Sequence, residues 1–191
     1  MLKFTPDTNV EPVKGSLLLA EPFMDDPYFQ RKVILLCEHN EEGSFGFVLN
    51  NYIDLTIDRL MAEFPHFASR VSVGGPVKNT NLYYIHTLGE QLAGSIQVTD
   101  TIYMGGDFEQ LKALAKSGQI PEDEIRFFVG YAGWSEGQLR AEIKNQSWFV
   151  VEADEPLLMD TSGDELWATM IGRLGKEYAH LANTPNDPSL N

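Results

Sequence analysis

The sequence predicts an α+β protein in which a mostly antiparallel sheet is accompanied by about four helices. Segments rich in leucine, β-branched and aromatic residues are dense in the first two thirds of the chain. Short gaps such as residues 40–44 (NEEGS) have the composition of tight turns, which favours hairpins between neighbouring strands. The helical patterns are isolated and do not alternate regularly with the strands. This order argues against a regular βαβ sheet.

Eight segments are predicted as strands because apolar residues either alternate or run continuously between turn residues. They are residues 16–23, 32–39, 45–50, 70–77, 81–88, 94–104, 125–132 and 147–153.

Three helices are predicted in the middle of the chain from their capping signals. Thr56 is placed to cap residues 57–64, which Pro65 would end. Asp107 is placed to cap a helix that stops at Gly118. The spacing of Ser135 and Gln138 predicts a capping box for a helix over 135–145.

A fourth helix is predicted near the C-terminus, where Ser162 and Glu165 have the spacing of another capping box. Its apolar side would consist of Leu166, Met170, Leu174, Tyr178 and Leu181. The whole pattern predicts an N-terminal arm (1–14), a single α+β domain (15–182) and a flexible C-terminal tail (183–191).

Composition excludes several classes of protein. Acidic residues outnumber basic ones 28 to 14, and a net charge of -14 disfavours direct nucleic-acid binding. No apolar stretch has the length of a transmembrane helix or of a signal peptide, so no membrane association is expected. A single cysteine cannot form an internal disulfide, which suits a reducing compartment. We therefore expect a cytoplasmic protein.

Cys37 raises the question of catalysis because Glu38 and His39 follow it directly. In a regular strand Cys37 and His39 would share one face. The run Val33–Cys37 is apolar, so we expect Cys37 to be a buried core residue. The alternative is a thiol-dependent enzyme with Cys37 activated by His39, although two residues of one strand face make a poor nucleophile–base pair. The other histidines do not have the spacing of metal ligands with His39, and no metal is expected.

Residues 130–139 (GYAGWSEGQL) offer a second candidate for catalysis. Residues 133–137 match G-x-S-x-G, and a serine hydrolase could combine Ser135 with a later aspartate and His180. The hairpin-rich strands do not predict the parallel sheet of that enzyme class, and Ser135 already serves as a predicted helix cap. A third interpretation is that the glycines and the helix N-terminus form an anion site. No cofactor motif is present in this segment.

The motifs together resemble one known family. Residues 24–50 (MDDPYFQRKVILLCEHNEEGSFGFVLN), 73–77 (VGGPV) and 130–143 (GYAGWSEGQLRAEI) are similar to the YqgE/AlgH family of bacterial proteins. The resemblance spans about residues 15–153. It implies an α+β fold with a branched sheet rolled into a pseudo-barrel, and it implies no particular reaction.

We therefore expect a non-catalytic binding or regulatory module, such as an indirect regulator of transcription. A thiol-dependent or serine enzyme is the alternative. No catalytic residue and no cofactor are assigned, and the partner would be a small anionic ligand or another protein. We expect the end of strand 32–39 at His39 and residues 130–138 to line one depression. The candidate binding surface consists of Arg31, Glu38, His39, Asn50, Gly75, Tyr131, Gly133, Trp134, Ser135 and Gln138.

Overall fold

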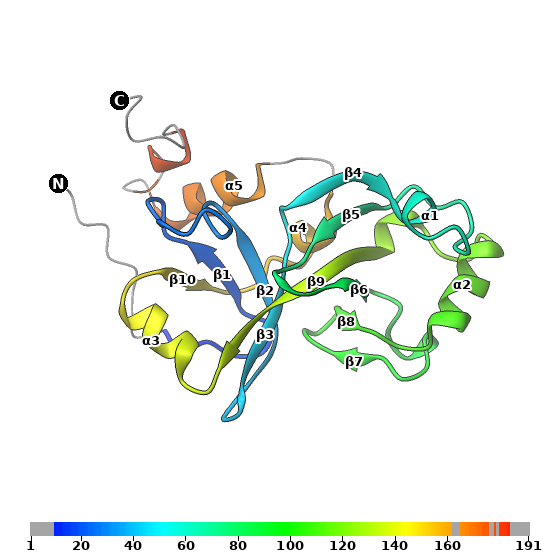
Figure 1. Cartoon of the computed structure of the whole chain (residues 1–191), viewed down its shortest axis with the longest axis horizontal. Helices are drawn as coiled ribbons and strands as arrows, with labels where there is room; N and C mark the ends of the chain where they lie inside the picture. The colour runs from blue at the N-terminus through cyan, green and yellow to red at the C-terminus, as the bar shows by residue number, and fades with distance from the viewer. Residues whose placement is uncertain (1–9, 162–164, 176–177, 179, 184–191) are drawn as a thin grey trace.

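The structure of the protein is a computed structural model that describes residues 10–161, 165–175, 178 and 180–183. Within these residues one branched sheet of ten strands is flanked by helices (Figure 1). The strands are β1 (Leu17–Ala20), β2 (Val33–Asn40), β3 (Gly43–Val48), β4 (Tyr52–Thr56), β5 (Arg70–Val73), β6 (Val77–His86), β7 (Ile96–Gln97), β8 (Tyr103–Met104), β9 (Ile125–Ser135) and β10 (Trp148–Val151).

Five α-helices and three short 3-10 helices are assigned among the described residues. They are α1 (Ile57–Leu60), α2 (Phe108–Lys116), α3 (Gln138–Lys144), α4 (Glu155–Met159), α5 (Leu166–Leu174), η1 (Gly89–Gln91), η2 (Glu122–Glu124) and η3 (Leu181–Asn183). Strand β4 and helix α4 are present in the structure but were not predicted from the sequence. The α+β class and the branched, mostly antiparallel sheet are confirmed.

The sheet branches at β9. Its main path runs β10-β1-β2-β3-β9-β6-β8-β7, and β5 joins β9 beside this path and carries β4. The pairing of β5 with β9 is parallel, whereas the other pairings within the described residues are antiparallel. The path has two ends, at β10 and β7, so the sheet is not closed into the barrel that the resemblance implies.

Three apolar clusters form the core. One lies between the sheet and helices α4 and α5, and it contains Leu35, Cys37 and Phe47. A second lies on the opposite face of the same strands, under α3, around Trp134 and Trp148. The third lies at the other end of the molecule beneath α1 and α2, which Figure 1 shows beside each other. Strand β9 contributes residues to all three clusters, and it therefore joins the two ends of the molecule.

Two of the predicted helices differ from the structure in length. Helix α1 stops at Leu60, and Met61 is already extended, although its backbone N–H still bonds to the Ile57 carbonyl. The Thr56 hydroxyl donates to the Asp58 side chain and does not cap the backbone. Helix α5 ends at Leu174, so the predicted continuous helix to Leu181 is interrupted at Gly175.

The remaining capping predictions have different outcomes. Asp107 caps α2, because its side chain accepts a hydrogen bond of 2.9 Å from the Gln110 backbone N–H. Ser135 is not the cap of α3: β9 extends through Ser135, and the N-cap of α3 is Gly137. The predicted cap at Ser162 lies outside the described residues, as do residues 1–9 of the arm and 184–191 of the tail.

Candidate functional site

Strand β2 contains a β-bulge at Cys37. Its neighbours Leu36 and Glu38 pair with two consecutive residues of β3, so Cys37 is one residue in excess over the partner strand. A bulge of this kind breaks the alternation of side chains along a strand. Cys37 and Glu38 therefore share a face of the sheet, and His39 lies on the other face.

The neighbours of Cys37, Glu38 and His39 confirm this assignment of side chains to the two faces. Phe45, which is opposite Glu38, packs against the same apolar cluster as Cys37. His39 is opposite Ser44, and Ser44 is in turn opposite Trp134 of the cluster under α3. The prediction that Cys37 and His39 share a face is wrong, because it assumed an unbroken strand.

Cys37 is fully buried, and burial raises the pKa of its thiol far above the ordinary value. Its thiol donates only to the Leu35 carbonyl, at a sulfur–oxygen distance of 3.6 Å. A thiolate nucleophile needs a lowered pKa and access to solvent. The geometry of Cys37 offers neither.

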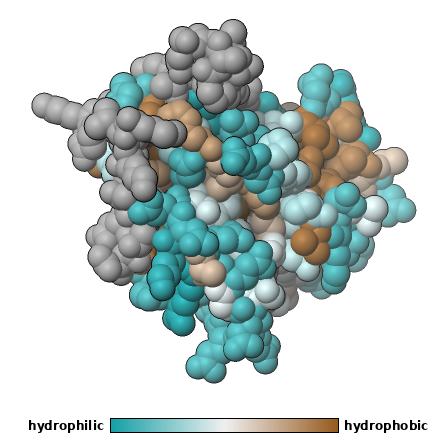
Figure 2. Space-filling view, turned by 60° about the vertical axis from the view of Figure 1, so that its left-hand side comes forward, coloured by the Kyte–Doolittle hydropathy of each residue, from teal (hydrophilic) through white to brown (hydrophobic). Residues whose placement is uncertain are grey.

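The end of β2, the start of β3 and the end of β9 enclose a shallow depression, which we call the hairpin depression. Its volume is about 580 Å³. Figure 2 shows the hydrophilic tip of the β2–β3 hairpin projecting at the lower edge of the molecule. The lining residues are Glu38, Asn40, Glu42, Gly43, Ser44, Phe45, Val77, Tyr83, Tyr131, Gly133 and Trp134.

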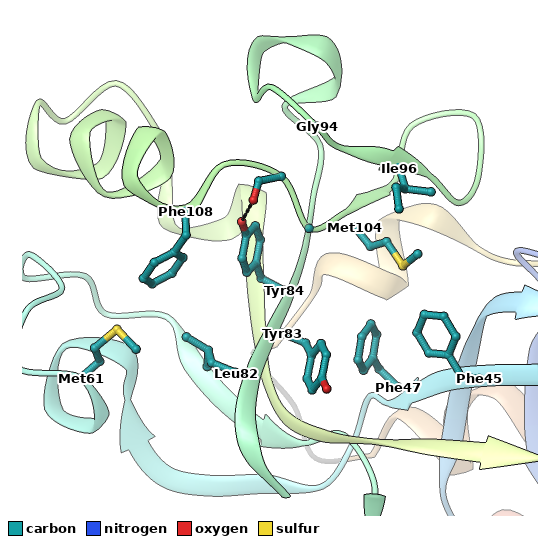
Figure 3. A pocket seen from close by; sticks show the side chains of 12 residues that line it. Phe45, Phe47, Met61, Leu82, Tyr83, Tyr84, Gly94, Ile96, Met104 and Phe108 are labelled. Atoms are coloured by element: carbon teal, nitrogen blue, oxygen red, sulfur yellow. Dashed lines mark hydrogen bonds between the residues drawn. The ribbon is translucent and has the colours of Figure 1, made fainter. Parts of the chain in front are cut away.

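A second depression of about 480 Å³ adjoins the first, and we call it the apolar depression. Phe45 and Tyr83 line both depressions, so these two rings form a shared wall. Figure 3 shows Tyr83, Phe47 and Phe45 in a row from β6 to β3, with Met104 reaching toward them from β8. We call the two depressions together the aromatic groove. Its apolar half contains no charged side chain among the described lining residues.

The far wall of the apolar depression is the segment between β6 and α2, which includes β7 and β8, and buried polar groups hold it in place. The Tyr84 hydroxyl donates to the Gly106 carbonyl at 2.6 Å (Figure 3). His86 Nε2 lies 3.0 Å from the Gly105 carbonyl, and His86 Nδ1 accepts from the Leu88 N–H at 3.2 Å. Burial lowers the pKa of His86, so the ring is neutral when it makes these bonds.

The structure brings together four of the sequence-predicted site residues. Glu38, Tyr131, Gly133 and Trp134 line the hairpin depression. His39 does not line the depression, although its Nδ1 lies 2.6 Å from the hydroxyl oxygen of Ser44, which does. Burial is the main cause that lowers the pKa of His39, and Arg140 adds to it.

Arg31 and Asn50 lie at the other end of β2. The Asn50 side chain accepts from the Val33 N–H at 2.9 Å and donates to the Arg31 carbonyl at 2.8 Å. The Arg31 guanidinium lies 4.8 Å from the centre of a Trp167 ring. These contacts give Asn50 a structural role in holding the chain at the entry to β2.

Gly75 also has a structural role. A Cβ at this position would overlap the backbone of Tyr131. The segment between β5 and β6 crosses β9 at this point, where the two chains approach too closely for any side chain at Gly75.

Ser135 and Gln138 form a local pair at the end of β9. The Gln138 Oε1 atom accepts from both the backbone N–H and the hydroxyl of Ser135, at 3.0 and 3.1 Å. Residues 132–135 pair with β3, so their backbone belongs to a ladder and not to an open loop. The predicted anion-binding loop is therefore a strand, and the helix that follows it has only seven residues.

Glu142 of α3 belongs to the family-like motif of residues 130–143, but it is not among the candidate binding residues predicted from the sequence. Its Oε2 atom accepts from the indole N–H groups of Trp134 and Trp148, each at 2.8 Å. Its Oε1 atom accepts from Gln138 Nε2 at 2.9 Å. The indole of Trp134 is thereby held in place, and its N–H is occupied within the protein. The spacing of Trp134 and Glu142 across a turn gave no signal of this clamp.

The described residues offer neither a metal site nor a membrane-spanning helix. No group of three or more His, Cys, Asp or Glu side chains is placed to hold a metal ion among them. None of the helices assigned in this part of the chain is both long and apolar enough to cross a bilayer.

Comparison with known proteins identifies the family. The model of the AlgH-like family (DUF179) matches residues 17–179. The chain belongs to the AlgH-like family. This confirms the resemblance seen in residues 24–50, 73–77 and 130–143.

Relatives and solved structures agree with this assignment. A UPF0301 protein of Parabacteroides distasonis is 40% identical to the AlgH-like chain over 185 residues, covering 96% of this chain and 93% of the relative. The UPF0301 protein CT0663 of Chlorobaculum tepidum is 39% identical over 177 residues, covering 93% and 95%. The solution structure of the AlgH protein from Pseudomonas aeruginosa is similar with a TM-score of 0.73 and 27% identity, covering 97% and 98%. The crystal structure of DIP2367 from Corynebacterium diphtheriae has the same fold, with a TM-score of 0.75, 24% identity and coverage of 92% and 94%.

Proposed function

We propose that this AlgH-like chain is a non-catalytic module that binds another protein through the aromatic groove. The observation that carries the proposal is the wall of Phe45 and Tyr83 shared by two adjoining depressions. Aromatic and methionine side chains gathered in an open groove are typical of protein-recognition surfaces. We place this binding in the cytoplasm, in an indirect regulatory role, because a net charge of -14 disfavours contact with DNA.

An anionic ligand is the weaker of the two partner hypotheses. Glu38 and Glu42 line the hairpin depression, and no lysine, arginine or histidine lines it among the described residues. A carboxylate or phosphate would meet repulsion there. The groove therefore favours a protein partner.

Photo-crosslinking from inside the groove tests the proposal. Ile96 lines the apolar depression and is 51% exposed, so a benzoylphenylalanine at this position would contact a bound partner. Phe23 is 49% exposed and lines neither depression, which makes it a matched control position. We expect discrete protein adducts in cells from position 96 and not from position 23. The absence of adducts from position 96, or the same adducts from both positions, would contradict the proposal.

One contact favours the enzyme alternative. The Ser44 hydroxyl and His39 Nδ1 are 2.6 Å apart, as a nucleophile and base would be. Among the described residues no carboxylate is hydrogen-bonded to the His39 ring, so the third member of a triad is absent there. A fluorophosphonate probe should leave both Ser44 and Ser135 unmodified. Stoichiometric labelling of either serine would contradict the proposed binding module and favour a serine hydrolase.

A further inference from the structure

The hairpin depression has an aromatic corner. Tyr131 stands at 72° to Phe45, with ring centres 5.7 Å apart, and at 85° to Tyr83, with ring centres 5.8 Å apart. All three side chains are half-buried. All three residues line the depression, so a cation bound there would lie beside aromatic rings. A cation within about 6 Å of such ring centres is attracted by the ring quadrupole.

Carboxylates stand beside this aromatic corner. Glu38 Oε1 accepts from the Asn40 amide at 2.7 Å, and the Asn40 amide oxygen accepts from the Glu42 backbone N–H at 2.9 Å. This network links the Glu38 side chain to the hairpin backbone at Glu42, and both glutamates line the depression and are exposed. The second Glu38 oxygen has no hydrogen-bond partner in the part of the chain that the structure describes. A bound cation could thus meet a carboxylate as well as aromatic rings.

The adjoining apolar depression limits what the cation can be attached to. Phe45 and Tyr83 separate a charged depression from one lined by apolar side chains such as Met104 and Phe108. In an extended peptide, side chains two residues apart lie on one side at about 7 Å from each other. An extended segment can therefore place a cationic and an apolar side chain on the two sides of this wall.

We propose that the hairpin depression binds an arginine side chain of an extended segment of a protein partner. A large apolar side chain two residues away would occupy the apolar depression. Arginine is favoured over lysine because its planar guanidinium stacks on aromatic rings and bonds to a carboxylate at the same time. The net charge of -14 adds long-range attraction for a basic segment. This inference rests on the proposed function and names the chemistry of the partner.

A short peptide tests the inference directly. The fluorescein-labelled sequence Gly-Ser-Leu-Ser-Arg-Ser-Leu-Ser-Gly places leucine two residues from arginine in both chain directions. Its binding to the full chain is measured by fluorescence anisotropy at low salt. Replacing arginine by citrulline keeps the shape and removes the charge, and we expect this change to weaken binding about tenfold.

Protein variants locate the site. The double variant Glu38→Gln/Glu42→Gln should weaken the peptide about tenfold, and Tyr131→Leu should do the same. Glu41→Gln is the matched control, because Glu41 lies on the same hairpin and does not line the depression. It should change binding less than about twofold, because its exposed charge lies outside the depression and is screened by solvent. Thermal unfolding of Tyr131→Leu separates a lost ring contact from a lost fold, and the glutamate variants test the site without altering the core.

Three results would overturn the inference. Equal binding of the arginine and citrulline peptides would exclude a cation site. Equal effects of Glu41→Gln and the double variant would indicate unspecific attraction. Free argininamide that binds as tightly as the peptide would assign the site to a small organic cation. In the first two cases the crosslinks from position 96 still test the proposed protein binding. A failure of the arginine site can therefore be distinguished from a failure of the proposed function.

Discussion

The two halves of β9 differ in a way that separates scaffold from site. From Ile125 to Phe128 every residue is buried, and the strand is bonded on both sides by β5 and β6. From Tyr131 to Ser135 buried and accessible residues alternate, and this part of the strand pairs with the start of β3. One strand thus serves as core at one end and as groove wall at the other. Position along a strand, and not the identity of the strand, decides which residues are available to a partner.

The junction between the two halves is the most sensitive place to test. Gly75→Ala puts a methyl group into the Tyr131 backbone, and we expect a loss of about 4 kcal/mol in the free energy of unfolding. Gly137→Ala is the matched control: its φ of 70° disfavours alanine, but the space around it is open. It should cost about 1 kcal/mol. Urea unfolding measures both, and equal costs would show that the chains do not cross closely at Gly75.

The buried half depends on Arg126. Its guanidinium is fully buried and donates to the Leu49 and Leu158 carbonyls, and to the Tyr52 hydroxyl at 3.2 Å. Arg126→Leu would remove a buried donor from both carbonyls and leave the Leu49 carbonyl with the Ser72 hydroxyl at 3.2 Å, and we expect a loss of about 3 kcal/mol in the free energy of unfolding.

Arg140→Leu is the control for Arg126, because Arg140 pairs with Glu11 on the surface, where both side chains are exposed. Its effect on the free energy of unfolding should stay within about 0.5 kcal/mol. Urea unfolding measures both variants. Similar losses in the free energy of unfolding would show that the buried half does not depend on Arg126 more than on an exposed arginine.

Acidification should also act on the buried half, through His86, which is opposite Ile125 of β9. Burial lowers the pKa of His86 in the folded protein below its ordinary value of 6.5. The unfolded chain then binds the proton more readily, so stability present above pH 6.5 is lost as the pH falls. His39 contributes with the same sign, since its pKa is also lowered. We expect His86→Gln to have a smaller loss of stability between pH 7.5 and 5 than the parent, and an identical loss would refute this role.

The smallest effect is expected at the open end of β9. Ser135→Ala removes a hydroxyl that is bonded to Gln138 and caps no helix. The free energy of unfolding should therefore change by less than about 0.5 kcal/mol. Asp107→Ala removes a true cap of α2 and should cost about 1 kcal/mol. A Ser135 effect as large as that of Asp107 would restore the capping box that the sequence predicts.

Much of the fold was predictable because its signals are local. Apolar runs such as 33–37 predicted buried strands, and the spacing of Asp107 and Gln110 predicted the start of α2. Strand β4 was missed because its residues are half-buried or exposed and show little alternation. Helix α4 was missed because it has only five residues, although Pro156 near its start is a known signal.

The site was less predictable because it depends on register and on distant strands. Nothing in residues 33–39 indicates a bulge, yet that one extra residue puts His39 on the face opposite Cys37. The aromatic corner combines Phe45, Tyr83 and Tyr131 from three strands that only the sheet topology brings together. The sequence indicated Tyr131 and the hairpin but had no means of adding Tyr83.

The continuity of β9 has a consequence for how binding would be observed. Amide hydrogens exchange with solvent when local openings expose them, and strand ends open more readily than the core. A segment held in the groove would make opening of residues 131–135 more costly, while we expect the buried residues 125–128 to open only with the whole core. Slowed exchange should therefore begin at the open end and stop near Gly130. Occupancy of the groove would thus be seen as a boundary within β9 between amides whose exchange slows and amides whose exchange is unchanged.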